Sequence, residues 1–184
     1  MRPLQLYLHL LKTHPYKTQA TVTGGLFLIS DIISQQLIEK KGLKSHDFIR
    51  TLRQTAVGFI ITGPLIYKYY KTLEKFVGGH VMVQPIKKMI IDQTLFAPSY
   101  ICMYFAVIGY TSGMDTTQVK EKLQKDFKST MIMNWKVWPF VQICNFYFIP
   151  LQHRAITTNS VAVIWNTYLS WKANAVKNDD VTSQ

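Results

Sequence analysis

Long apolar stretches separated by short basic connections run along most of this chain. About 20 apolar residues in a helix, rising about 1.5 Å each, are needed to cross the hydrocarbon core of a bilayer. The pattern therefore predicts an all-α membrane protein, a bundle of four transmembrane helices with amphipathic surface helices. The predicted spans are residues 18–38, residues 54–67 extended by residues 68–70, residues 93–114 and residues 131–151.

The predicted spans differ in polarity. Residues 93–114 carry no charge, whereas the first span contains Asp31, with Gln35 one helical turn further along, and the fourth contains Lys136. Residues 155–171 are also uncharged but are rich in Thr, Ser and Asn. This last stretch either crosses the membrane a fifth time or lies at its interface, and the sequence leaves both open.

Two segments have the pattern of amphipathic surface helices. The first thirty residues contain no acid, whereas Arg2, Lys12 and Lys17 are basic, and residues 2–12 have an apolar and a polar face, which is typical both of mitochondrial targeting and of a helix lying on the bilayer. We expect this helix to end before Pro15, because the residue before a proline avoids the α conformation. Residues 115–129 should form the second surface helix, which Asp115 and Gln118 begin as a capping box.

All four tryptophans lie between residues 134 and 171. Trp and Tyr rings favour the headgroup level of a membrane, where both the apolar ring and the polar atom are satisfied. We interpret this region as a membrane span with aromatic anchors, followed by a second apolar segment that touches the bilayer. The alternative is an aromatic-rich, buried helix pair of a soluble protein.

The 184 residues leave room for one domain. We expect a single polytopic domain over residues 1–176 and a disordered polar tail over residues 177–184. A formal net charge of +11 is compatible with nucleic-acid binding. The basic residues recur in every connection rather than in one patch, however, which favours the anionic lipids of a bilayer as partner, without direct contact to nucleic acid.

No enzyme motif is present in the sequence. The chain has no glycine-rich phosphate loop with a Lys, no His-Glu-x-x-His and no Cys-x-x-Cys. Its five histidines are scattered without the spacing of metal ligands. We therefore expect a protein that is not an enzyme, with no catalytic residue, no cofactor and no bound metal.

The spans instead contain polar side chains at membrane depth, together with prolines. The polar candidates are Asp31, Gln35, Asp92, Gln93, Asn134, Lys136, Asn145 and Arg154. The candidates for breaking helices are Pro64, Pro98, Pro139 and Pro150. Broken helices with polar residues are tolerated in a membrane where they line a cavity. The set predicts a water-filled path for small solutes or ions, and the alternative is that these groups only join helices by hydrogen bonds.

Asp31 is the carboxylate placed well inside an apolar span, and Gln35 extends the same polar face. An ionised Asp31 that faced water would favour cations, as acidic rings do in cation channels. An Asp31 paired with a base such as Arg154 would instead be structural, because removing either partner would leave the other buried and uncompensated. The sequence leaves both roles open.

These residues also match a known family. The sequence resembles the Mpv-seventeen / peroxisomal-membrane-protein family of small polytopic proteins of organelles, over about residues 7–173. The matching elements are His14-Pro15, Asp31-Ile32-Ile33-Ser34-Gln35-Gln36-Leu37, Gly63-Pro64, Asp92-Gln93, Phe96-Ala97-Pro98, Trp138-Pro139, Asn145-Phe146-Tyr147, Pro150-Leu151 and residues 161–172. The departures are Ser30, Tyr67 and Tyr69, where the family usually has Gly, His and Trp, and Leu4, where it has an N-terminal Trp.

The resemblance implies a four-span channel of weak selectivity in the mitochondrial inner membrane, which modulates the membrane potential. It also implies roles in mitochondrial homeostasis, nucleotide supply, maintenance of mitochondrial DNA and the limiting of oxidative stress. The rival functions are a peroxisomal membrane channel of the same family and a non-conducting scaffold for inner-membrane complexes. The sequence is compatible with a homo-oligomer and sets neither the transported solute, the gating, nor the orientation in the membrane.

Overall fold

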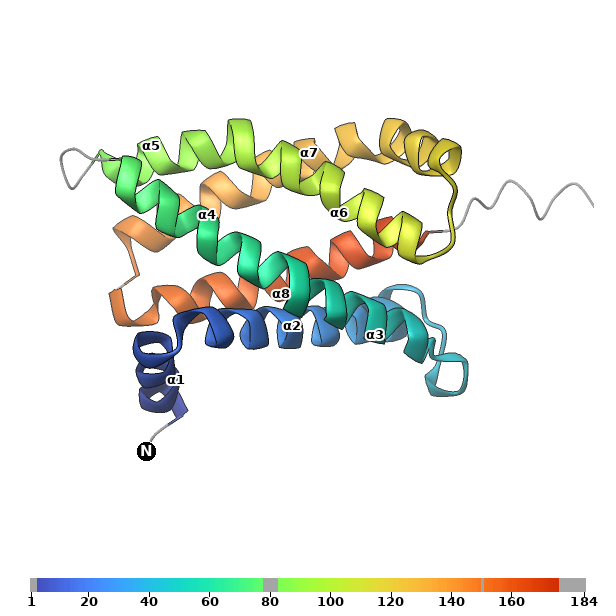
Figure 1. The fold of residues 1–184 in the computed structure, drawn as a ribbon, viewed down its shortest axis with the longest axis horizontal. Helices are drawn as coiled ribbons and strands as arrows, with labels where there is room; N and C mark the ends of the chain where they lie inside the picture. The colour runs from blue at the N-terminus through green and yellow to red at the C-terminus, as the bar shows by residue number, and fades with distance from the viewer. Residues whose placement is uncertain (1–2, 78–82, 150, 176–184) are drawn as a thin grey trace, which may run out of the picture.

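The computed structural model of the chain describes residues 3–77, 83–149 and 151–175, and within them every regular element is helical (Figure 1). The α-helices are α1 (Pro3–Thr13), α2 (Pro15–Ile33), α3 (Phe48–Ala56), α4 (Gly63–Phe76), α5 (Gln84–Ile91), α6 (Ala97–Thr111), α7 (Thr116–Tyr147) and α8 (Leu151–Asn174). The short helical segments are the π-helical η1 (Ser34–Ile38), η3 (Val57–Thr62) and η4 (Asp92–Phe96), and the 3-10 turn η2 (Leu43–Ser45). The prediction of an all-helical fold is confirmed.

The π-helical segments join α-helices into longer continuous helices. Helix α2 continues into η1, α3 continues through η3 into α4, and α5 continues through η4 into α6, with helical dihedral angles at every junction. Together with α7 and α8 they form a bundle in which successive long helices run in opposite directions (Figure 1). Helix α1 stands across the end of the bundle where α2 begins.

The prolines at positions 64, 98 and 139 do not break helices, which corrects the prediction. Segments η3 and η4 end two residues before Pro64 and Pro98, so each proline is the second residue of the following α-helix. A π turn widens the helix by one residue, which relieves the contact that a proline ring makes with the preceding turn. Pro139 lies inside the uninterrupted α7. Pro150 falls outside the described residues, as does the predicted disordered tail, residues 177–184.

Helix boundaries differ from the predicted ones in the second half of the chain. Residues 115–129 and 131–151 were expected as two helices, but α7 runs through both without interruption and ends at Tyr147. Ser129 and Thr130 lie at the predicted junction, and both hydroxyls donate to the Asp126 carbonyl within the helix. The helix therefore has no reason to stop there. The capping box of Asp115 and Gln118 at the start of α7 is confirmed.

Two helices of the described chain are long and apolar enough to cross a membrane. They are Pro15–Ile38, with 24 residues, and Gln84–Thr111, with 28 residues. Large apolar side chains face outward on many of the helices, as lipid contact would require; Phe48 is 74% exposed and Ile164 is 72% exposed. The apolar core lies inward, around Phe27, Tyr104 and Leu169, where α2, α6 and α8 meet.

Glycines allow α2 to approach the continuous helix α3–η3–α4 very closely. A Cβ atom built on Gly63 would lie 2.6 Å from the Ala20 Cα, and one on Gly58 would lie 2.8 Å from the Phe27 ring. Both distances are shorter than real Cβ contacts, so these positions have no room for a side chain. Small residues at such crossings let helix backbones pack directly against each other in a membrane.

Candidate functional site

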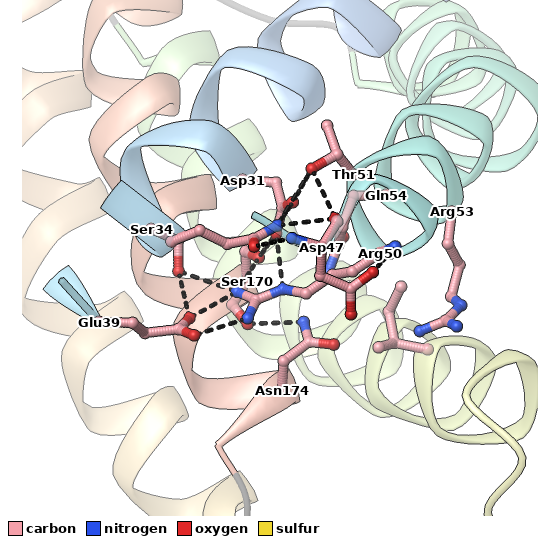
Figure 2. A network of polar contacts seen from close by, with 12 residues as sticks. Asp31, Ser34, Glu39, Asp47, Arg50, Thr51, Arg53, Gln54, Ser170 and Asn174 are labelled. Atoms are coloured by element: carbon pink, nitrogen blue, oxygen red, sulfur yellow. Dashed lines mark hydrogen bonds and ion pairs between the residues drawn. The ribbon is translucent and has the colours of Figure 1, made fainter. Parts of the chain in front are cut away.

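Asp31 is the centre of a polar network at the end of the bundle where α2 ends and α3 begins (Figure 2). Its carboxylate is fully buried and accepts four hydrogen bonds. One oxygen accepts from Arg50 Nε at 2.8 Å and from Ser170 Oγ at 2.6 Å. The other accepts from Thr51 Oγ1 at 2.6 Å and from Gln35 Nε2 at 2.8 Å. Helices α2, α3 and α8 and segment η1 therefore meet on one side chain.

Arg50 lies between two carboxylates. Its Nε bonds Asp31, while its Nη1 and Nη2 reach the two oxygens of Glu39 at 2.8 and 2.7 Å. The Nη2 also donates to Ser34 Oγ and Ser170 Oγ, both at 3.1 Å. Burial alone would raise the pKa of the Glu39 carboxyl, but the hydrogen bond and charge of Arg50, helped by Lys41, hold it below its ordinary value. The pair therefore stays charged at neutral pH.

Local signals place Arg50 in this position. Asp47 caps α3, accepting the Arg50 backbone N–H at 2.9 Å, so Arg50 occupies the first turn. The Gln35 amide fixes the connection from the other side, accepting from Asp47 N at 2.8 Å and donating to Asp47 O at 3.0 Å. The loop between α2 and α3 is thus tied down by the same residues that complete the network.

The proposed pairing of Asp31 with Arg154 is wrong. The base on Asp31 is Arg50, and Arg154 lies half-buried near the start of α8, where its Nε donates to the Ile149 carbonyl at 3.1 Å. Arg50 lies in the basic connection between the first two predicted spans, residues 18–38 and 54–67. Recognition of Asp47 as a helix cap would have extended the second span back to Phe48 and brought Arg50 into it.

A second buried cluster surrounds Asp92, at the start of η4. Gln93 Nε2 donates to the Asp92 carboxylate at 3.0 Å, and Tyr70 Oη on α4 donates at 3.5 Å. Asn134 Nδ2 on α7 donates to Gln93 Oε1 at 2.7 Å, and Trp135 Nε1 donates to the Gln93 carbonyl at 3.2 Å. Three candidates from the sequence, Asp92, Gln93 and Asn134, therefore come together, all more than nine-tenths buried.

The two buried carboxylates differ in their charge partners. Asp31 is paired with a guanidinium, whereas the partners of Asp92 are neutral, and no ion pair to it occurs among the described residues. A carboxylate at membrane depth without a base is stable when it faces water or holds a cation or a proton. Chemically, Asp31 is therefore a structural group and Asp92 is available to a positively charged species.

The remaining polar candidates lie apart from these clusters. Asn145 joins α7 to α8, donating from Nδ2 to Thr158 Oγ1 at 3.0 Å, and its Oδ1 is buried without a hydrogen bond among the described residues. Lys136 is exposed on α7, one turn from the exposed Phe140. Within the described ranges no group of three His, Cys, Asp or Glu side chains could hold a metal ion.

Several polar residues of the core were not expected from the sequence. They are Glu39, Arg50, Thr51, Gln54, Thr62, Tyr69, Tyr70, Tyr100, Tyr104 and Ser170. Tyrosines in a membrane span usually indicate anchors at the headgroup level, and a single Ser or Thr forms no sequence pattern that would indicate a buried polar contact. Their roles depend on which helices become neighbours.

Comparison with known proteins identifies relatives over nearly the whole length. The model of the Mpv17 / PMP22 family matches residues 109–170. The "Mitochondrial inner membrane protein Mpv17" of Xenopus laevis is 43% identical over 168 residues, 91% of this chain and 95% of the relative. That of Homo sapiens is 41% identical, over 91% and 96% of the two chains. "Peroxisomal membrane protein 2" of Bos taurus is 36% identical, over 92% and 88%. No solved structure matches.

These relatives are full-length counterparts, because the matched region covers most of both chains in each comparison. Mpv17 proteins of several vertebrates, named for the mitochondrial inner membrane, show identities of about two residues in five. Their names and the two candidate membrane helices agree with the predicted location. The chain therefore belongs to the Mpv17 / PMP22 family and is a protein of the mitochondrial inner membrane.

Proposed function

We propose that the chain is a weakly selective channel for small solutes or ions, which modulates the potential across the mitochondrial inner membrane. The observation that carries the proposal is Asp92, a carboxylate inside the candidate span Gln84–Thr111 that is 8% exposed and bonded to neutral groups. Intramembrane carboxylates are costly and mark ion or proton pathways. Roles in mitochondrial homeostasis, nucleotide supply and maintenance of mitochondrial DNA rest on the family resemblance alone.

The geometry favours the Asp92 cluster over the Asp31 network as part of the route. Tyr70 on α4 and Gln93 on η4 bond Asp92, and Asn134 on α7 bonds Gln93, so groups of several helices meet in one cluster, as they do around a path between helices. Asp31 was the preferred pore candidate from the sequence. Its oxygens are saturated by Arg50 and three neutral donors, which leaves the carboxylate no face for a passing ion.

Asp92→Asn is expected to lower the cation preference of the channel several-fold, because the amide keeps the shape of the side chain but removes the charge. The measurement is the reversal potential of the purified protein in a planar bilayer under a KCl gradient. Asp115→Asn, at the exposed cap of α7, is the matched control and should behave as the wild type. An unchanged reversal potential in folded Asp92→Asn would remove Asp92 from the route.

We also propose that α8 is a membrane crossing, in addition to the four predicted spans. Its 24 residues rise about 36 Å, enough to cross the hydrocarbon core. It lies beside the candidate span α2, whose Ser30 donates to the Val163 carbonyl at 3.0 Å and whose Asp31 accepts from Ser170. These two bonds hold adjacent residues of α2 against two turns of α8, so this part of α8 lies at the depth of α2 in the membrane. Five crossings put the two ends of the chain on opposite sides.

Cysteine labelling distinguishes five crossings from four. With Cys102 and Cys144 replaced by Ser, single cysteines at Lys12, Ser45 and Ala175 are exposed to an impermeant maleimide added to one side of oriented vesicles. Position 45, in the connection between α2 and α3, reports the side opposite position 12. With five crossings, position 175 should react from the same side as position 45. Reaction from the same side as position 12 would place α8 at the interface instead.

A non-conducting scaffold is the second candidate function. The Asp31 network, which ties α2, α3 and α8 together, and the large apolar side chains that face outward suit a rigid unit that other membrane proteins contact. The bilayer recording separates the two candidates. A folded, inserted protein without any conductance would support the scaffold and end the channel proposal.

A further inference from the structure

A row of polar side-chain pairs follows the contact between two long helices, α3–η3–α4 and η4–α6. Tyr104 Oη donates to Gln54 Oε1 at 2.9 Å, the hydroxyls of Thr62 and Tyr100 are 3.3 Å apart, and Tyr70 Oη reaches Asp92 at 3.5 Å. In successive pairs the residue number rises along α3–η3–α4 and falls along η4–α6, so the two helices are antiparallel neighbours. We call this row the polar seam; its members are Gln54, Thr62, Tyr69, Tyr70, Asp92, Tyr100 and Tyr104.

Most of the polar seam is buried, with the half-exposed Tyr70 at one end, and stacked rings hold it in place. Gln54, Thr62 and Tyr104 are each 1% exposed. The rings of Tyr104 and Tyr100 stack with centroids 6.2 Å apart, and Phe96 continues the stack from Tyr100 at 5.8 Å. Because ring stacking fixes where the hydroxyls point, the polar atoms of the seam occupy defined positions in the core.

The seam connects the two buried carboxylate clusters. From Asp92 to Tyr104 the helix rises about 18 Å, well over half of the roughly 30 Å hydrocarbon core. At the far end, Gln54 follows Arg50 and Thr51 by one turn on α3 and lies beside the Asp31 network (Figure 2). A line of polar groups therefore crosses most of the membrane inside the bundle.

Two atoms of the seam are buried without a hydrogen bond in the described structure: Gln54 Nε2 and Tyr69 Oη. Gln54 Nε2 lies between Tyr104 and the Asp31 network. Tyr69, which stacks on Phe96 at 3.8 Å and adjoins Tyr70 at 5.1 Å, lies between Tyr100 and Asp92. Each therefore occupies a position where the row of hydrogen bonds is interrupted. Buried polar atoms of this kind are normally satisfied by an ordered water molecule.

We propose that the polar seam is a proton path, in which water molecules bonded to Gln54 and Tyr69 link the hydroxyls between Asp92 and the Asp31 network. Asp92 takes up a proton at one end. Each hydroxyl or water along the row accepts a proton on a lone pair and releases its own, so one proton enters and one leaves. The Gln54 amide only orients its water, and is a positioning residue.

The path has an exit on the opposite side of the membrane. Thr51 Oγ1, which donates to Asp31, lies 3.0 Å from His46 Nε2 in the connection before α3. His46 is half-buried and gives the proton to bulk water. Arg50 and Lys41 pair with Asp31 and Glu39 at this end, so the local charge is balanced and does not repel a proton. The inference rests on the proposed crossing of the membrane but requires no wide pore.

Proton flux into vesicles tests the path. The full-length protein is reconstituted with a pH-sensitive dye inside, and a potassium gradient with valinomycin supplies the driving potential. Tyr69→Phe is the main variant, because the Tyr69 hydroxyl faces Asp92 without a hydrogen bond of ordinary length, and phenylalanine keeps the ring that stacks on Phe96. We expect the proton flux to fall about tenfold in Tyr69→Phe, and similarly in Gln54→Leu. Tyr110→Phe, a half-exposed tyrosine on α6 outside the seam, should not change it.

The outcomes separate this inference from the channel proposal, since chloride flux is recorded in the same vesicles. A selective loss of proton flux in Tyr69→Phe and Gln54→Leu, with unchanged chloride flux, supports the path. Equal proton flux in all variants overturns it, even if the protein conducts chloride. Proton flux without chloride flux in the wild type supports the path and contradicts the weakly selective channel. A wild type that moves neither ion overturns both.

Discussion

Arg50→Met is expected to lower the free energy of unfolding by about 3–5 kcal/mol, because it leaves the Asp31 carboxylate buried without a base and removes one of the two bases on Glu39. Asp31 and Glu39 both bond the Arg50 guanidinium, and the Asp31 side chain has no exposed surface. Met keeps the length and apolar stem of the side chain, so the loss reports the charge and its hydrogen bonds. The measurement is reversible unfolding of the purified protein in detergent micelles.

Arg53→Met is the matched control for this substitution. Arg53 lies on the same helix, one turn further, and its bond to Ser112 is exposed. Loss of the Arg53 side chain should lower the free energy of unfolding by at most about 1 kcal/mol. Neutralising the whole network, with Asp31→Asn and Glu39→Gln added to Arg50→Met, should restore part of the stability, since no charge then remains buried. Equal stability of Arg50→Met and Arg53→Met would show that the network does not hold the helices together.

Gly63→Ala is expected to destabilise the bundle by about 1–3 kcal/mol, although Ala is the better helix former. The new Cβ would lie 2.6 Å from the Ala20 Cα and 3.2 Å from the Gln19 carbonyl oxygen. These are backbone atoms, so a rotamer change cannot relieve the contact, and α2 must move away from α4. Unfolding in micelles and the yield of protein inserted in membranes should both fall.

Gly25→Ala provides the comparison for the glycine effect. Gly25 is exposed on α2, and no heavy atom lies within 4 Å of its added Cβ. Ala should therefore stabilise this position by about 0.5–1 kcal/mol, the usual difference from Gly in a helix interior. If both alanine variants changed stability by the same amount and in the same direction, the tight crossing of α2 and α4 would be contradicted.

Features that depend on neighbouring residues could be predicted from the sequence. The first long helix, the end of α1 before Pro15 and the capping box at Asp115 follow from short-range rules. The continuity of α7 could not be predicted, because the change from charged to apolar sequence near Ser129 alters the surroundings of the helix without altering its backbone. Likewise, the widening of a helix before Pro64 is a cooperative adjustment that the residue types do not reveal.

In the candidate site, too, contacts between residues close in the sequence could be predicted, whereas contacts between different helices could not. Gln35 was placed one turn from Asp31, and the structure shows a 2.8 Å hydrogen bond between them. Asp92 and Gln93 were singled out correctly as buried polar residues, and so was Asn134. Pairings across helices, such as Asp31 with Arg50, were missed because polarity at membrane depth indicates a need for a partner but does not say which helix supplies it.

The bond from Ser170 to Asp31 has a consequence for the order of assembly. The charges of Asp31, Glu39, Lys41 and Arg50 lie within one helical hairpin, so they can neutralise each other as soon as that hairpin enters the membrane. Ser170 is separated from Asp31 by most of the chain and arrives with the last helix to be synthesised. The hairpin of α2 and α3 therefore inserts with the Asp31 network incomplete. Docking of α8 supplies the Ser170 hydrogen bond and completes the network late in assembly.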